Sequence, residues 1–162
     1  MPKITWGPWV KLVVCIFLPL AVGAIGGAAT ASSVGSWYQT LTKPVFTPPS
    51  WLFAPAWTAL YVLMGVAAWL VWRRGWGAPA VRPALILFGI QLLLNAFWSP
   101  VFFGLRSPGA GLVVIVALLA ALLATTIAFA RVRGLAAVLL VPYILWVGFA
   151  TVLNAAVWRL NP

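Results

Sequence analysis

Residues 37–57 read WYQTLTKPVFTPPSWLFAPAW and lie between two long apolar runs. The prolines of this stretch are Pro44, Pro48, Pro49 and Pro55, and its aromatic residues are Trp37, Tyr38, Phe46, Trp51, Phe53 and Trp57. Because proline has no backbone donor and holds φ at about −65°, the sequence predicts a stiff, largely non-helical segment from Tyr38 to Ser50. We interpret residues 37–50, the cover loop, as a lid over the mouth of an apolar pocket in a helical membrane bundle.

The composition indicates that most of the surface lies in lipid. Of 162 residues, 65% are hydrophobic and 6% are charged, and the mean hydropathy is +1.12. A soluble domain carries about 25% charged residues, so water cannot be the solvent for most of this chain. The length suits a single domain, residues 1–162, that consists of one bundle of spans.

Five apolar runs are long enough to cross about 30 Å of hydrocarbon at about 1.5 Å per helical residue. They cover approximately residues 9–31, 51–72, 83–103, 109–130 and 135–158. Residues 29–31 resemble a signal-peptide cleavage site, but the run before them is longer than the usual apolar region of such a peptide. The fold class is therefore all-α, a polytopic membrane protein with five transmembrane helices.

The charged residues are 10 lysines and arginines, without any Asp, Glu or His. One side of the expected bundle carries Lys3, Lys11, Arg73, Arg74, Arg82, Arg131 and Arg133, and the other carries Lys43, Arg106 and Arg159. These cations lie at the ends of apolar runs, which indicates anchoring in the lipid bilayer rather than binding of nucleic acid. The positive-inside rule then places the N-terminus in the cytoplasm, and we expect a bacterial membrane as the host.

The missing residue types exclude several kinds of chemistry. Without carboxylates or imidazoles there is no acid–base pair, Ser-His-Asp triad, His-based zinc site or carboxylate proton relay. We therefore expect no bound metal, and an ion-coupled transporter or a pore ranks last among the possible functions. Cys15 is the single cysteine, so no internal disulfide forms, and its expected role is that of a small buried hydrophobe.

Tryptophan is unusually frequent, with 11 residues. Those at the ends of the apolar runs are typical of an interfacial aromatic belt: Trp6, Trp9, Trp72, Trp76 and Trp158. Trp57, Trp98 and Trp146 lie inside runs, where a buried indole needs a partner for its N–H or a flat ligand to stack on. For Trp57 and Trp146 we favour a pocket wall over plain packing, whereas Trp98 fits either role.

A few polar side chains interrupt the spans. Gln91 and Asn95 are four residues apart and therefore share one helix face near the middle of the membrane. Such amides either join helices by hydrogen bonds or bind a polar group of a ligand, and Asn154 presents the same alternatives. Lys43 could contact a ligand carboxylate at the pocket mouth, or it could be an ordinary interfacial lysine.

The fourth apolar run contains a stripe of small side chains. Its members are Ala117, Ala120, Ala121 and Ala124. Small residues at this spacing allow close approach of a second helix, so the stripe predicts either a seam inside the bundle or the face of a homodimer.

Four segments carry a resemblance to a known family. They are WYQTLTKPVFTPPSW at 37–51, AWTALYVLMG at 56–65, LNAFWSPVFFG at 94–104 and VPYILWVGFATVLNAAVWRLN at 141–161. Together they resemble the translocator protein or tryptophan-rich sensory protein (TspO/MBR) family, and the resemblance covers nearly the whole chain. It implies a five-helix bundle, often dimeric, with a pocket beneath the first long loop.

The resemblance also implies ligands and site residues. Family members bind porphyrins such as protoporphyrin IX and haem, isoquinoline-type drugs and, in animals, cholesterol. By motif position the ligand-binding residues would be Tyr38, Pro48, Trp57, Asn95, Trp146 and Ala150. The chain departs from the family pattern at Gln39 and Leu160, where acidic residues are frequent. It also lacks the tyrosine of the sterol-associated pattern, because Ala155 and Ala156 precede Val157-Trp158-Arg159, which makes cholesterol binding doubtful.

Two functions from different classes follow from these observations. The first is a membrane receptor or carrier in tetrapyrrole transport or stress sensing, in which a porphyrin stacks between Trp57 and Trp146 and its propionates reach Lys43 or interfacial arginines. The second is an enzyme that degrades porphyrins with light and oxygen, for which Trp57 and Trp146 are the candidate catalytic residues. Neither requires a cofactor besides the porphyrin or haem ligand itself. A purely structural membrane protein is the remaining alternative.

Overall fold

The computed structural model describes residues 7–162, so Lys3 and Trp6 lie outside the described residues. This part of the chain is helical and contains no strand. Five of its helical segments are long and apolar enough to cross a membrane, as the sequence predicts. In chain order the elements are α1 (Pro8–Gly35), α2 (Trp37–Thr40), α3 (Ser50–Trp72), α4 (Val81–Ser99), the π-helix η1 (Pro100–Gly104), α5 (Pro108–Val132), α6 (Gly134–Val138) and α7 (Val141–Leu160).

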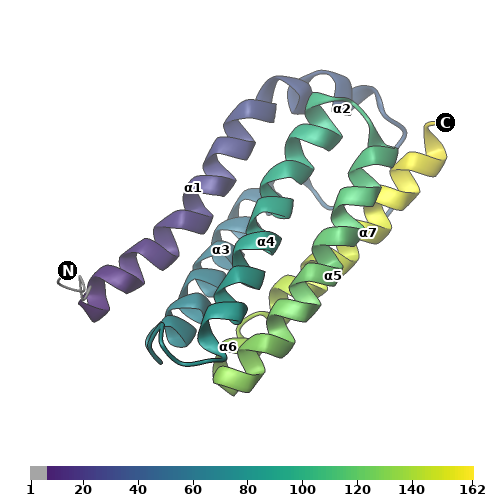
Figure 1. Ribbon diagram of the computed structural model, residues 1–162. Coiled ribbons are helices and arrows are strands. Elements are labelled where there is room, and N and C mark those ends of the chain that lie inside the picture. The colour runs from purple at the N-terminus through teal and green to yellow at the C-terminus, as the bar shows by residue number, and fades with distance from the viewer. Residues whose placement is uncertain (1–6) are drawn as a thin grey trace.

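The spans run alternately up and down, and α1 begins at the end of the bundle opposite to that at which α7 ends (Figure 1). The packing is most extensive between α4 and α5, between α1 and α3, and between α5 and α7. The cover loop crosses the end of the bundle at which α7 ends (Figure 1). An odd number of spans and a loop at this end agree with the sequence-based topology.

Several helix boundaries differ from the sequence-based prediction. The first span continues to Gly35, where Ser36 Oγ donates a hydrogen bond of 2.7 Å to the Ser32 carbonyl. The prediction of a non-helical cover loop is wrong for its first residues, because α2 forms one helical turn there, and it holds for residues 41–49. Proline in the middle of a run does restrict the chain, but it does not prevent the turn that precedes it.

Prolines also shape the third and fifth spans. Pro100 cannot donate within a helix, and the chain continues as the π-helix η1, in which the Leu105 N–H donates to the Pro100 carbonyl at 2.9 Å. The fifth span is not continuous as expected. It breaks at Leu139 and Leu140, and Pro142 then occupies the first turn of α7, where a missing N–H costs little.

The core is apolar and closely packed. Its most buried large side chains include Met64, Leu122, Phe129 and Tyr143. Helices α1 and α3 approach closely at Gly65, where an added Cβ would lie 2.6 Å from the backbone oxygen of Cys15. Only glycine fits this contact, so the backbone of α1 is held against α3 at this level.

The bundle end that carries the N-terminus of α1 also carries most cations. There the Lys11 ammonium lies 5.5 Å from the Trp72 ring centroid, and the Arg73 guanidinium lies 4.5 Å from that of Trp69. Cations and indoles pair favourably at such distances, and both kinds of side chain prefer the membrane–water interface. The side chains at this end of the bundle are therefore suited to the membrane–water interface.

Candidate ligand-binding site

A cavity of about 800 Å³ lies beneath the cover loop, and we call it the loop cavity. Its walls come from α1, α2, the cover loop, α3, η1 with the end of α4, and α7. Of the residues that the sequence predicts as a ligand site, Tyr38, Lys43, Pro48, Trp57, Trp146 and Ala150 line this cavity. Residues from distant parts of the chain thus meet as the motif positions imply, with Asn95 as the exception.

One wall of the loop cavity is a corner of aromatic rings. The Trp57 and Trp146 ring centroids are 6.4 Å apart with an interplanar angle of 83°, and Tyr61 stacks on Trp57 at 5.3 Å. A macrocycle between two rings needs about 3.5–4.0 Å of space on each of its faces. The expected sandwich between Trp57 and Trp146 therefore does not fit this arrangement, because the two indoles contact each other directly. A flat ligand has room against this corner, not inside it.

A second group of aromatic side chains lines the loop cavity, and of its members the sequence singles out only Trp98, without deciding between a pocket wall and plain packing. The group consists of Trp98, Phe102 and Phe103, with centroid distances of 5.4 Å for Trp98–Phe102 and 4.8 Å for Phe102–Phe103. The signal in the sequence is the run FWSPVFF, where Pro100 changes the helix from α to π. A π-helix alters the direction in which the following side chains point, and π-turns are frequent at functional sites.

Trp98 is held in place by Asn154. The Trp98 indole N–H donates to Asn154 Oδ1 at 3.1 Å, and Asn154 Nδ2 donates to the Pro108 carbonyl at 2.7 Å. Both Trp98 and Asn154 line the loop cavity. The amide of Asn154 therefore joins α4, α5 and α7. Of the two roles that the sequence left open for Asn154, this is the joining of helices by hydrogen bonds.

The mouth of the loop cavity carries positive charge. Lys43 is the only charged residue among the described residues that line the cavity, and its ammonium lies 4.8 Å from the Tyr38 ring centroid. Burial raises the pKa of the Tyr38 phenol, so this hydroxyl stays neutral at physiological pH. An anionic group of a ligand would meet a cation here without any competing negative charge.

The cover loop is fastened to the end of α7 by one side chain. The Thr42 N–H donates to Asn161 Oδ1 at 2.9 Å, and Asn161 Nδ2 donates to the Thr42 carbonyl at 2.9 Å. Sequence reasoning did not identify Asn161, since a polar residue near the C-terminus has no distinctive pattern. The two bonds satisfy both backbone groups of Thr42 and set the position of the cover loop.

Asn95 has a different position from the one that its motif implies. It lines a second cavity, described below, and not the loop cavity, and its amide accepts from the Tyr61 hydroxyl at 2.9 Å and donates to the Tyr143 hydroxyl at 2.8 Å. It therefore connects α3, α4 and α7, as the interhelical alternative predicts. Gln91, one turn earlier, is completely buried and neither polar atom of its amide has a partner among the described residues.

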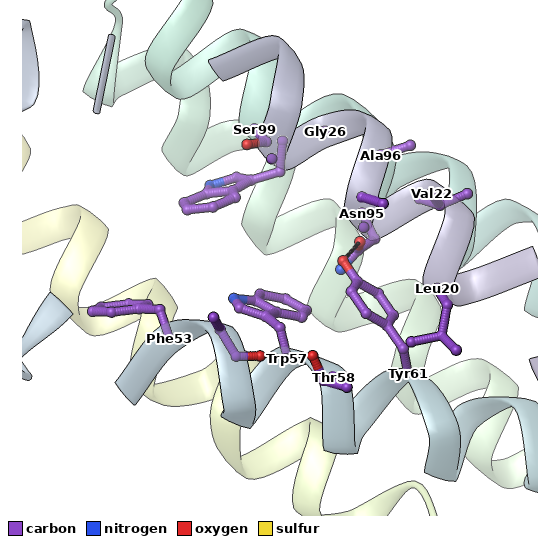
Figure 2. A pocket seen from close by; sticks show the side chains of 15 residues that line it. Leu20, Val22, Gly26, Phe53, Trp57, Thr58, Tyr61, Asn95, Ala96 and Ser99 are labelled. Carbon is purple, nitrogen blue, oxygen red and sulfur yellow. Dashed lines mark hydrogen bonds between the residues drawn. The ribbon is translucent and has the colours of Figure 1, made fainter. Parts of the chain in front are cut away.

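A second cavity of about 520 Å³, the side cavity, lies between α1, α3 and α4. Figure 2 shows Phe53 and Trp57 of α3 on one side of it, Gly26 of α1 and Ser99 of α4 on the other, and the Tyr61 hydroxyl directed at Asn95. Trp57 and Trp98 line both cavities, so their indoles form the boundary between them.

Five apolar helices around aromatic-walled cavities define a multi-pass integral membrane protein. The family model for the TspO/MBR family matches residues 15–159, and the chain belongs to this family. It is 48% identical to the tryptophan-rich protein TspO of Chlorobaculum tepidum over 93% of this chain and 96% of that protein. It is 46% identical to the protein of the same name from Archaeoglobus fulgidus, over 93% and 97% of the two chains. The human translocator protein is 41% identical over 95% of this chain and 92% of its own length.

Proposed function

We propose that this membrane protein binds porphyrins such as protoporphyrin IX and haem in the loop cavity, and that it serves as a receptor or carrier for these tetrapyrroles in transport or stress sensing. The observation that carries the proposal is the loop cavity itself. Its volume of about 800 Å³ lies within the range of about 300–1,000 Å³ that is usual for small-molecule sites.

The lining of the loop cavity matches the chemistry of a porphyrin. The macrocycle is flat and apolar, and the corner of Trp57 and Trp146 offers it two aromatic surfaces, to which Phe102 and Phe103 add further aromatic lining. The propionates are anionic, and Lys43 supplies a cation at the mouth. We place the macrocycle against the indole corner with its propionates directed toward the cover loop. No additional cofactor is required for binding.

The test is a titration of the purified protein with protoporphyrin IX, followed by tryptophan fluorescence. Saturable quenching is expected, and its amplitude should fall more in Trp57→Phe and Trp146→Phe than in Trp76→Phe. Trp76 is a matched control because it is exposed and lines neither cavity. Lys43→Gln should weaken binding by up to about fivefold, as expected for a partly exposed ion pair. An equal loss of quenching in all three tryptophan variants would place the ligand elsewhere.

A second function is favoured by one observation, the contact between oxidisable rings. Trp57 contacts Trp146 edge-on and also stacks on Tyr61, whose hydroxyl is joined through Asn95 to Tyr143. Such a group of rings could carry an oxidising equivalent during light-driven breakdown of a porphyrin by dioxygen. Illumination of the complex in air should then give products that the Trp57→Phe, Trp146→Phe double variant does not form. Identical products from both proteins would exclude this role for the indoles.

A homodimer is a further proposal. Ala117 and Ala120 of the small-residue stripe are exposed on α5, and Ala121 and Ala124 are half-buried. An exposed small-residue stripe permits close approach of a second copy in the membrane. In a Cys15→Ser background, Ala117→Cys should form a disulfide-linked dimer on oxidation, whereas a cysteine in place of Ala29 on α1 should not.

A further inference from the structure

The side cavity has a row of exposed residues along one edge. This edge is lined by two residues of α1, Ala24 and Gly27, and by two residues of α3, Ala54 and Thr58. All four residues are exposed in the described chain. We call the space between these two pairs the lateral gap. Both helices are membrane spans, so residues exposed at this height face the hydrocarbon of the bilayer.

Helices α1 and α3 are in tight contact on one side of the lateral gap. A Cβ at Gly65 would lie 2.6 Å from the Cys15 carbonyl oxygen, and a Cβ at Gly23 would collide with the Tyr61 ring. After Gly23, the residues of α1 that line the side cavity are Ala24, Gly26 and Gly27, which have small side chains or none. A Cβ at Gly27 would meet no atom within 4 Å, which shows that the space next to this residue is empty.

The neighbouring edge, between α1 and α4, is closed at the same level. Thr30 Oγ1 lies 3.2 Å from Ser99 Oγ, and a Cβ at Gly26 would be in ordinary contact with Ser99 at 3.8 Å. The buried hydroxyl of Thr30 thus ties the two helices together. The exposed residues of the side cavity therefore lie on α1 and α3, and none lies on α4.

The side cavity is continuous with the loop cavity. Six residues line both cavities: Gly27, Phe53, Ala54, Trp57, Trp98 and Ser99. The cover loop itself is held over the loop cavity by the two hydrogen bonds between Asn161 and Thr42. The shared lining therefore joins the exposed edge of the side cavity to the corner formed by Trp57 and Trp146. Figure 2 shows the Trp57 end of this path, with Phe53 and Thr58 beside it on α3.

We propose that the lateral gap is the route by which an apolar porphyrin passes between the bilayer and the loop cavity. This inference rests on the proposed binding function and adds the path of the ligand. Trp57 stands where the two cavities meet, so a macrocycle that enters through the gap slides along this indole before it reaches Trp146.

Filling the gap tests the route. Ala24 and Thr58 line the side cavity but not the loop cavity, so a double variant with Ala24→Leu and Thr58→Leu narrows the path and leaves the binding surface intact. Ala29→Leu is the matched control, because Ala29 is exposed on the same helix and lines neither cavity. Protein in liposomes is mixed with liposomes that contain protoporphyrin IX, and tryptophan quenching is followed in time.

A gate changes rates without changing the equilibrium, because the free energy of binding does not depend on the path. We expect association and dissociation to slow together by about tenfold in the double variant, with Kd unchanged and with no effect of Ala29→Leu. Unchanged rates with intact binding overturn the route. Faster release at an unchanged association rate overturns it as well, because the substitutions would then have damaged the site instead.

A second measurement does not depend on porphyrin. Phospholipids brominated on their acyl chains quench nearby indoles, and the signal of Trp57 is the difference between the unaltered protein and Trp57→Phe. We expect brominated lipids to quench Trp57 and the double variant to lose most of this quenching. If protoporphyrin IX fails to bind at all, the proposed function falls, and lipid quenching still decides whether the gap is open. Absence of Trp57 quenching by brominated lipids overturns the inference.

Discussion

Gln91 and Asn95 lie one turn apart on α4, both buried, yet only Asn95 has hydrogen-bond partners among residues 7–162. An unsatisfied buried polar group costs about 1–3 kcal/mol. Gln91→Met keeps the length of the side chain and removes this cost, so it should stabilise the protein by that order. Asn95→Leu should instead destabilise it by a similar amount, because the Tyr61 and Tyr143 hydroxyls lose their common partner.

Thermal unfolding in detergent tests these two variants. The substituted positions lie one helical turn apart, and the two substitutions should change Tm in opposite directions. A lower Tm for Gln91→Met would contradict the argument by showing that its amide does have a partner. The same comparison separates two roles that the sequence could not. A glutamine and an asparagine on one helix face look equivalent in the sequence, whereas only neighbouring helices decide which amide is satisfied.

At the residue scale, the sequence predicted those site residues whose type and motif position alone mark them as part of a pocket. Trp57, Trp146 and Tyr38 were identified from tryptophans inside apolar runs and from motif positions, and all three line the loop cavity. Phe102, Phe103 and Asn161 were missed. Phe102 and Phe103 turn toward the cavity because η1 is a π-helix, and Asn161 acts through Thr42, which lies more than a hundred residues away in the chain. Side-chain direction after a π-turn and long-range pairing are not encoded in local periodicity.

At the scale of the elements, five spans were predictable because each is a long apolar run that ends at cations, prolines or glycines. The interruptions at Pro100 and Leu139–Leu140 were not. Both segments are as apolar as their surroundings, so hydropathy does not mark them. The one-turn helix α2 was not predicted either, because the prolines that follow it in the cover loop indicate a non-helical segment.

The contact between α1 and α3 depends on a glycine, which gives an element-scale prediction. A methyl group at Gly65 would meet the backbone of Cys15 and Ile16, neither of which can move without shifting α1. Gly65→Ala should therefore destabilise the protein by about 1–3 kcal/mol, as overpacking does. Gly89→Ala is the control: its Cβ meets nothing within 4 Å, so better helix propensity should stabilise the protein by up to about 1 kcal/mol. Equal effects of the two substitutions on Tm would refute a close α1–α3 contact.

The attachment of the cover loop to α7 gives a second prediction at this scale. Asn161→Ala removes both hydrogen bonds to Thr42, so the Thr42 amide should lose protection from hydrogen exchange, while global stability changes by no more than about 1 kcal/mol per exposed bond. Asn161→Asp keeps the acceptor and loses the donor, so it should preserve protection of the Thr42 amide. If Thr42 exchanges equally fast in all three proteins, Asn161 does not hold the cover loop.

At the scale of the whole molecule, the distribution of charge predicts an orientation in the membrane. One end of the bundle carries most of the cations in the described chain, namely Lys11, Arg73, Arg74, Arg82, Arg131 and Arg133. The other end carries Lys43, Arg106 and Arg159. Because cytoplasmic segments carry the excess of lysine and arginine, we expect the link between α3 and α4 in the cytoplasm and the cover loop on the opposite side. The lateral gap would then lie in the outer half of the bilayer, near the cover loop.

Cysteine labelling measures this orientation. In a Cys15→Ser background, Val45→Cys introduces a fully exposed thiol in the cover loop, and Gly77→Cys introduces one in the link between α3 and α4. An impermeant maleimide added to intact cells should label the cysteine at position 45 and reach the one at position 77 only after lysis. Labelling in the reverse order would mean that the charge bias does not govern insertion. A porphyrin would in that case enter the lateral gap from the inner leaflet.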